Sequence, residues 1–202
     1  MTEISGTVGP IARALPRTRQ AALSKAGANA DTAWRRWATK HRVVAAMLGG
    51  LVGVHFASVL GSWFGGFHLY RLDYSTGNGA VYLPKAAPAV QFVVGGLSHY
   101  ADGVFFGLIF AVAVSPLLPL PATRAGNLAK ALIFGTILAV LALFVTAPYA
   151  FAPLRGIHDP LIALHLGWKY VLSVLLFHWI YGLQLGLIYS PLDEDPSAAG
   201  RC

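Results

Sequence analysis

Four long apolar stretches constrain the fold of this chain more than any other feature. They lie at Val43–Phe64, Ala89–Val114, Ala131–Phe151 and Gly167–Tyr189. A helix of roughly 20 predominantly apolar residues crosses the hydrocarbon core of a bilayer, which is about 30 Å thick. Charged residues make up 11% of the 202 residues, whereas a soluble domain carries about 25%. We therefore expect an all-α integral membrane protein, a four-helix bundle whose spanning domain covers residues 43–190.

Basic residues indicate the orientation of this bundle. They gather in the tail before the first stretch and in the connection between the second and third. Because Lys and Arg near span ends are retained in the cytoplasm, both termini are predicted to be cytoplasmic, as a basic tail at 1–42 and a short tail at 191–202. The net charge of +7 is concentrated in the first tail, which suits anionic lipid better than nucleic acid. Within it, DTAWRRWATKHR is a candidate interfacial helix with Asp31 as N-cap.

The connections on the opposite side carry turn and cap signals. The first contains Gly-Asn-Gly and three tyrosines, which predicts an interfacial hairpin or a lid. In the second, Asp159 is a predicted N-cap and Pro160 the first residue of a helix. Prolines at the ends of spans, such as Pro148, favour unbroken helices. Cys202 is the only cysteine, which excludes an internal disulfide and a thiolate metal site.

One motif occurs twice, in the second and fourth stretches. SHYADGVFFGLIF begins at Ser98 and FHWIYGLQLGLIY at Phe177, and both have His, three residues, Gly, three residues, then Gly-Leu-Ile. Because both stretches run in the same direction, we expect two helical hairpins arranged as a parallel repeat. With this repeat the chain resembles families of small prokaryotic four-span membrane proteins that are rich in glycine and have no assigned activity. The resemblance implies a location in the prokaryotic inner (cytoplasmic) membrane.

Small residues recur every four positions along each apolar stretch. Such stripes are the surfaces by which membrane helices approach one another closely. We expect helix packing at seven glycines in particular: Gly49, Gly53, Gly103, Gly107, Gly135, Gly182 and Gly186.

Three histidines, His55, His99 and His178, lie at a similar depth in three spans. Each is roughly 10 to 12 residues, or about 15–18 Å, from the outer boundary and so near the bilayer midplane. Ionisable side chains at this depth are unfavourable without partners and often functional. Two interpretations stay open. Either each imidazole is neutral and bonded to Asp102, Tyr181, Ser98 or a backbone carbonyl, or two of them bind a haem b, a bacteriochlorophyll, a metal or a quinone, with Asp102 orienting an imidazole from behind.

The sequence leaves three classes of function open. Asp102 is the only acid in any span, which argues against a proton pump, and no phosphate-binding Gly-rich loop is present. The packing stripes favour a non-catalytic accessory or assembly subunit of a larger respiratory or photosynthetic membrane complex. A small membrane cytochrome or other cofactor-binding electron carrier is an alternative, and a channel or transporter for a small solute is a second one. The expected partners are other membrane subunits and anionic lipid.

Overall fold

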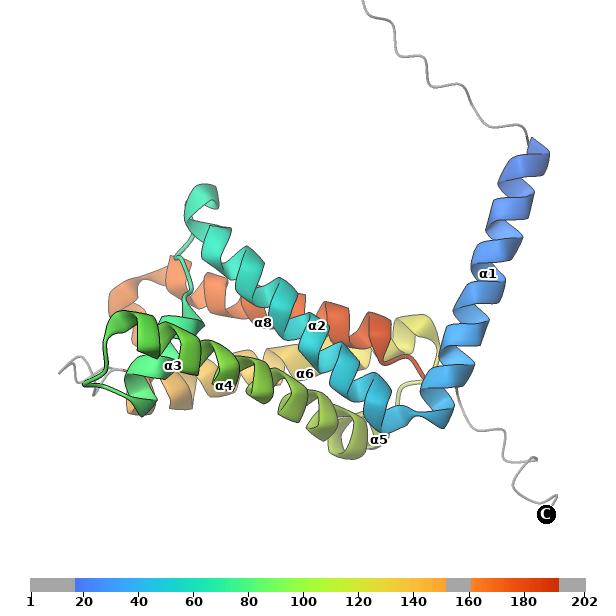
Figure 1. Ribbon diagram of the computed structural model, residues 1–202. Coiled ribbons are helices and arrows are strands. Elements are labelled where there is room, and N and C mark those ends of the chain that lie inside the picture. Colours follow the sequence, from blue (N-terminus) through green and yellow to red (C-terminus); the bar gives the residue numbers. More distant parts are fainter. Residues whose placement is uncertain (1–16, 152–160, 193–202) are drawn as a thin grey trace, which may run out of the picture. The chain divides into compact units, whose positions relative to one another are not determined.

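The computed structural model describes residues 17–151 and 161–192, and the regular elements of these residues are all helices (Figure 1). Four of them are long and apolar enough to cross a membrane, at Arg42–Phe67, Pro88–Leu117, Arg124–Ala150 and Trp168–Ile188. The prediction of an all-α bundle with four spans is therefore confirmed. The third span begins at Arg124 rather than Ala131, because Thr123 caps the helix there by accepting a hydrogen bond from the backbone N–H of Gly126.

Several elements make up these spans. The first span consists of α2 (Arg42–Trp63) and the 3-10 turn η1 (Phe64–Phe67); the second of α4 (Pro88–Ile109), η2 (Phe110–Val114) and α5 (Ser115–Leu117); the third of α6 (Arg124–Leu141) and η3 (Ala142–Phe151); and the fourth is α8 (Trp168–Ile188), which follows the 3-10 helix η4 (Leu161–Leu166).

Each span is a continuous helix, as the proline positions predict. Two segments, η2 and η3, are π-helical instead of α-helical. Pro148 lies inside η3, where its lack of an N–H prevents the α-helical hydrogen-bond pattern from continuing. A π-helical turn accommodates such an interruption, and such turns are frequent at functional sites. The helix start predicted at Asp159 and Pro160 lies outside the described residues.

The basic tail forms one helix, α1 (Arg17–Lys40). Its residues up to Trp34 belong to a compact unit of their own, and the bundle begins at Arg35. Asp31 lies inside α1 and not at its N-cap, so the predicted start at Asp31 is wrong. The alanine-rich stretch before Asp31 has a helix propensity high enough to continue the helix through Gly27.

Close backbone contacts hold the bundle together. α2 packs against both α4 and α8, and α8 packs against α6. A Cβ atom on Gly107 of α4 would lie 2.5 Å from the carbonyl oxygen of Ala46, and one on Gly182 of α8 would lie 2.5 Å from that of Ala131. Only glycine permits this approach. All seven glycines expected to pack are buried against a neighbouring helix: Gly49 and Gly53 against α8, Gly103 and Gly107 against α2, Gly135 against α8, and Gly182 and Gly186 against α6.

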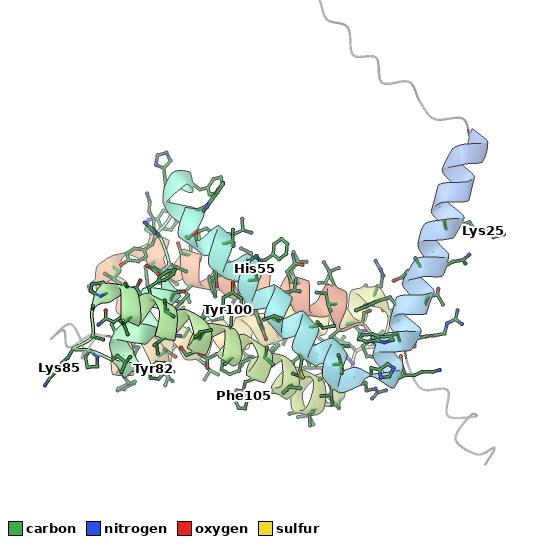
Figure 2. The ribbon with its side chains drawn as sticks, in the orientation of Figure 1. Lys25, His55, Tyr82, Lys85, Tyr100 and Phe105 are labelled. Carbon is green, nitrogen blue, oxygen red and sulfur yellow. The ribbon has the colours of Figure 1, made fainter. Side chains whose placement is uncertain are left out.

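The outward surface of the spans is apolar, as a lipid-facing surface must be. Leu97, Phe105 and Val112 are 70%, 58% and 72% exposed, and Figure 2 shows Phe105 on the outside of α4. Exposed side chains of this size on every span would be unfavourable in water and are ordinary in lipid. The bundle thus has the surface of a membrane protein.

The connection between the first two spans is helical and not a hairpin. Its helix is α3 (Tyr74–Tyr82). Asp73 caps it, because its carboxylate accepts hydrogen bonds from the backbone N–H (3.0 Å) and the hydroxyl (2.9 Å) of Thr76. α3 packs along α4, and a Cβ on Gly79 would lie 1.8 Å from the carbonyl oxygen of Gln91. Gly-Asn-Gly is therefore a point of close helix contact and not a turn.

One end of the bundle is held by Arg35. Its guanidinium donates hydrogen bonds to the carbonyl oxygens of Ser190 (3.2 Å) and Pro191 (3.3 Å), and to that of Ala122. These bonds join the end of α8 to the connection that precedes α6. We call this end of the bundle the Arg35 end and the opposite one, covered by α3, the α3 end.

Candidate functional site

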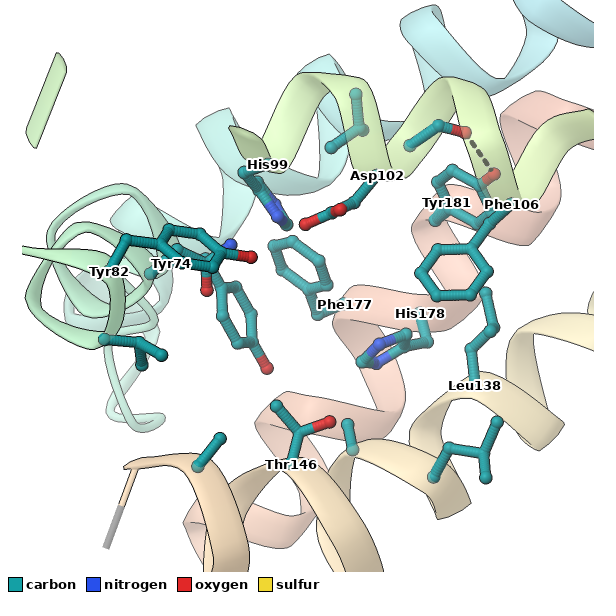
Figure 3. Close-up of a pocket in the computed structure, with 17 residues that line it drawn as sticks. Tyr74, Tyr82, His99, Asp102, Phe106, Leu138, Thr146, Phe177, His178 and Tyr181 are labelled. Carbon is teal, nitrogen blue, oxygen red and sulfur yellow. Dashed lines mark hydrogen bonds between the residues drawn. The ribbon is translucent and has the colours of Figure 1, made fainter. Parts of the chain in front are cut away.

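A cavity of about 280 Å³ lies inside the bundle, towards the α3 end (Figure 3). We call it the His99 cavity. Five elements or spans line it: α2 through Val54; α3 through Tyr74, Asn78, Val81 and Tyr82; α4 through His99, Asp102, Gly103 and Phe106; the third span through Leu138, Leu141, Ala142, Thr146 and Ala150; and α8 through Phe177, His178 and Tyr181.

The cavity lies between the second and third spans. At one level these spans are bridged through η2, where the ring of Phe110 packs 5.4 Å from that of Phe134 on α6. Nearer the α3 end the cavity lies between α4 and η3 instead. Phe106 and Leu138 line its side towards the Arg35 end, and α3 lines the other. A ligand of this cavity would therefore be held between two lipid-facing helices.

His99 reaches the cavity because it shares a helix face with the glycines that pack α4 on α2. Residues four apart lie on one face of a helix, and Gly103, four residues on, would place a Cβ 2.5 Å from Val54. The His99 ring stacks on that of Tyr74 at 5.3 Å and lies 5.8 Å from that of Phe177. Its Nε2 atom is buried and has no hydrogen-bond partner among the described residues. A buried polar atom left in this way destabilises a protein by about 1–3 kcal/mol.

His178 occupies the matching place on α8. Its Nδ1 lies 2.7 Å from the carbonyl oxygen of Val174 and donates to it. This bond keeps the proton of the neutral imidazole on Nδ1, so that Nε2 is a hydrogen-bond acceptor. Gly135 of α6 lies against the backbone of His178, which fixes the depth of this residue. Figure 3 shows His99 and His178 pointing towards the cavity from α4 and α8.

Neither histidine is hydrogen-bonded to Asp102 or Tyr181, and His178 has another of the expected partners, a backbone carbonyl. The half-buried carboxyl of Asp102 lines the cavity, and within residues 17–151 and 161–192 it makes no hydrogen bond or ion pair. Tyr181 donates its hydroxyl to the carbonyl oxygen of Gly103 at 2.8 Å (dashed in Figure 3). This bond ties α8 to α4, and it is Asp102 that stays available to a ligand.

His55 is separated from the other two histidines. It is exposed on the outside of α2, and its Nδ1 is hydrogen-bonded to the hydroxyl of Tyr100 at 2.7 Å (Figure 2). At about 100° per residue, His55 is turned by roughly 200° from Gly53, which packs against α8. The structure thus brings His99, His178 and Asp102 together around one cavity, and the prediction that His55 could share their ligand is wrong.

The residues contributed by α3 and η3 were not found from the sequence. Tyr74, Asn78 and Tyr82 come from a connection expected at the membrane interface, and Thr146 comes from the second half of the third span. The three tyrosines of that connection were the one available signal. Burial raises the pKa of Tyr74, so its hydroxyl stays protonated and polar but uncharged.

The chemistry of the lining residues is that of a site for a neutral ligand. No Lys or Arg is among the described residues that line the cavity, and residues 17–151 and 161–192 have no group of three or more His, Cys, Asp or Glu side chains that could hold a metal ion. The polar groups are imidazoles, one carboxyl, hydroxyls and one amide, set in an apolar and aromatic wall. They can donate and accept hydrogen bonds around a ring-sized molecule.

Comparisons of the chain with protein-family models, with curated proteins and with solved structures find no match. A function for this chain therefore follows from the chemistry of its own site and not from its fold.

Proposed function

We propose that the protein binds a neutral, membrane-dissolved ring compound of the quinone and quinol class in the His99 cavity. The observation that carries this proposal is the buried Nε2 atom of His99, which lacks a hydrogen-bond partner among the described residues and belongs to a side chain that lines a cavity. In the tautomer that carries its proton on Nε2, the imidazole would donate a hydrogen bond to a carbonyl oxygen of a quinone. The unfavourable burial of that group would then be offset in the complex.

The second imidazole and the carboxyl complement this donor. Nε2 of His178 is an acceptor, because Nδ1 donates to Val174, and the Asp102 carboxyl also accepts. Either group can take a hydrogen bond from the hydroxyl of a quinol. A ring with oxygens on opposite sides therefore finds donor and acceptor groups on two different helices, α4 and α8.

The residues present do not fit a tetrapyrrole. Small-molecule pockets measure roughly 300–1,000 Å³, and a cavity of about 280 Å³ suits one or two fused rings better than the macrocycle of haem b or bacteriochlorophyll.

The lining of the cavity favours a binding site over a solute pathway, because Phe106, Leu138 and Tyr181 line its side towards the Arg35 end. A quinone-binding subunit would suit the role of accessory or assembly subunit in an energy-transducing complex. That role stays a prediction, which co-migration with a larger complex on a native gel of solubilised membranes would test.

The proposal is tested by the affinity of the purified protein for 1,4-naphthoquinone, with naphthalene as the matched probe without oxygens. We expect naphthoquinone to bind more tightly, and His99→Phe to weaken its binding about five- to tenfold, as the loss of one net hydrogen bond implies. His55→Phe removes an imidazole outside the cavity and is the matched control. Equal affinities for the two probes, or an equal effect of both variants, would contradict the proposal.

A further inference from the structure

A second hollow, of about 330 Å³, lies at the Arg35 end of the bundle. The start of α2, the end of the second span, the beginning of α6 and the chain after α8 all line it. Its polar lining residues are Arg42, Ser115, Asn127, Lys130 and Tyr189. We call it the Lys130 crevice. It shares no lining residue with the His99 cavity.

Lys130 is the residue that most requires a partner there. Its side chain is only 7% exposed, and within the described ranges its ammonium group makes no hydrogen bond or ion pair. The ammonium nitrogen is not among the fully buried atoms that lack a partner, so the charge is accessible from the crevice while most of the side chain is buried. A lysine near the end of a membrane span can reach an anionic group at the membrane surface.

A second cation, Arg42, lines the same crevice. Tyr189 lines the crevice as well, so its phenol and the guanidinium group of Arg42 border the same hollow. None of the described residues that line the crevice is Asp or Glu. The crevice is therefore lined by two positively charged side chains.

Asn127, a neutral polar residue of the crevice lining, is already hydrogen-bonded. The side-chain amide of Asn127 donates to the carbonyl oxygen of Pro191 (3.0 Å) and lies 3.4 Å from the hydroxyl of Ser190. These bonds hold the chain after α8 against the first turns of α6. Lys130 is thus presented by a fixed frame and not by a loose surface.

We infer that the Lys130 crevice binds the phosphate group of an anionic phospholipid. Ammonium and guanidinium groups together are the usual protein ligands of phosphate. The crevice lies among the ends of four helices that are long and apolar enough to span a membrane, which is where lipid phosphates are found. Leu118, Leu120 and Leu192 add apolar surface to its lining, as suits a lipid better than a free ion.

The inference is tested by native mass spectrometry of the purified full-length chain with phosphatidylglycerol and with phosphatidylcholine. We expect a preference for phosphatidylglycerol, which Lys130→Met weakens about tenfold, the equivalent of about 1.4 kcal/mol for a charge-assisted hydrogen bond. Arg42→Gln, at an exposed residue, should weaken it severalfold without affecting folding. Lys130→Arg should retain it. Lys85→Met, at an exposed lysine of the α3 end (Figure 2), is the matched control.

Two further experiments test for other occupants of the Lys130 crevice. Inorganic phosphate that binds without any preference for the lipid would assign the crevice to a free anion and overturn the inference. Asp193, Glu194 and Asp195 follow Leu192 directly in the sequence, and their carboxylates are the other candidate occupants. Lipid binding that is seen only after Asp193→Asn, Glu194→Gln and Asp195→Asn are combined would show that the tail occupies the crevice. Equal binding of phosphatidylglycerol by the wild type, Lys130→Met and Arg42→Gln would also overturn the inference.

Discussion

Replacement of His99 by Phe should stabilise the ligand-free protein while it weakens ligand binding. Phe keeps an aromatic ring against Tyr74 and Phe177, whose centroids lie 5.3 Å and 5.8 Å from that of His99, and it removes the buried Nε2 that has no partner among the described residues. Such an atom destabilises a protein by about 1–3 kcal/mol. Because the phenyl ring is slightly larger and overpacking is also unfavourable, we expect a net gain of about 1 kcal/mol.

This gain can be measured by thermal unfolding in detergent micelles. For a chain of about 200 residues, 1 kcal/mol corresponds to a Tm shift of roughly 2–4 °C. His178→Phe is the comparison, because it loses the 2.7 Å bond from Nδ1 to Val174 and should lower the Tm. His55→Phe loses its bond to Tyr100 and should lower it slightly. A Tm for His99→Phe below that of the wild type would refute the reasoning, since Nε2 would then be well bonded in the free protein.

Three further outcomes are expected. Gly182→Leu should destabilise the bundle by about 1–3 kcal/mol, because even a Cβ atom there would lie 2.5 Å from the carbonyl oxygen of Ala131; Gly66→Leu, where nothing lies within 4 Å, should be nearly neutral in the same unfolding assay. Tyr181→Phe should lower stability by about 1 kcal/mol or less, because its 2.8 Å bond to α4 is lost; an unchanged Tm would exclude a stabilising role. A reporter fused after Cys202 should be active only in the cytoplasm, and activity on the outer side would reverse the predicted topology.

The spans and the inward direction of two histidines could be predicted from the sequence. Hydropathy along a helix is a local property, and a bilayer requires about 20 apolar residues to cross it; the number of spans follows from this alone. His99 and Gly103 are four residues apart, as are His178 and Gly182, so each histidine had to lie on the face that packs against other helices. The resulting prediction of an all-α four-span bundle needed no knowledge of which helices meet.

Which residues line the two sites depends on how the helices pack. A helix that is apolar on every side carries little information about its rotation, so nothing local showed that His55 lies on the outside of α2 or that Tyr74 of α3 stacks on His99. The sequence places Lys130 in a predicted cytoplasmic connection. In the structure α6 begins at Arg124, and Lys130 lies buried within this helix. Contacts between residues far apart in the sequence arise from the shapes of whole helix faces, which meet only when all four spans are assembled.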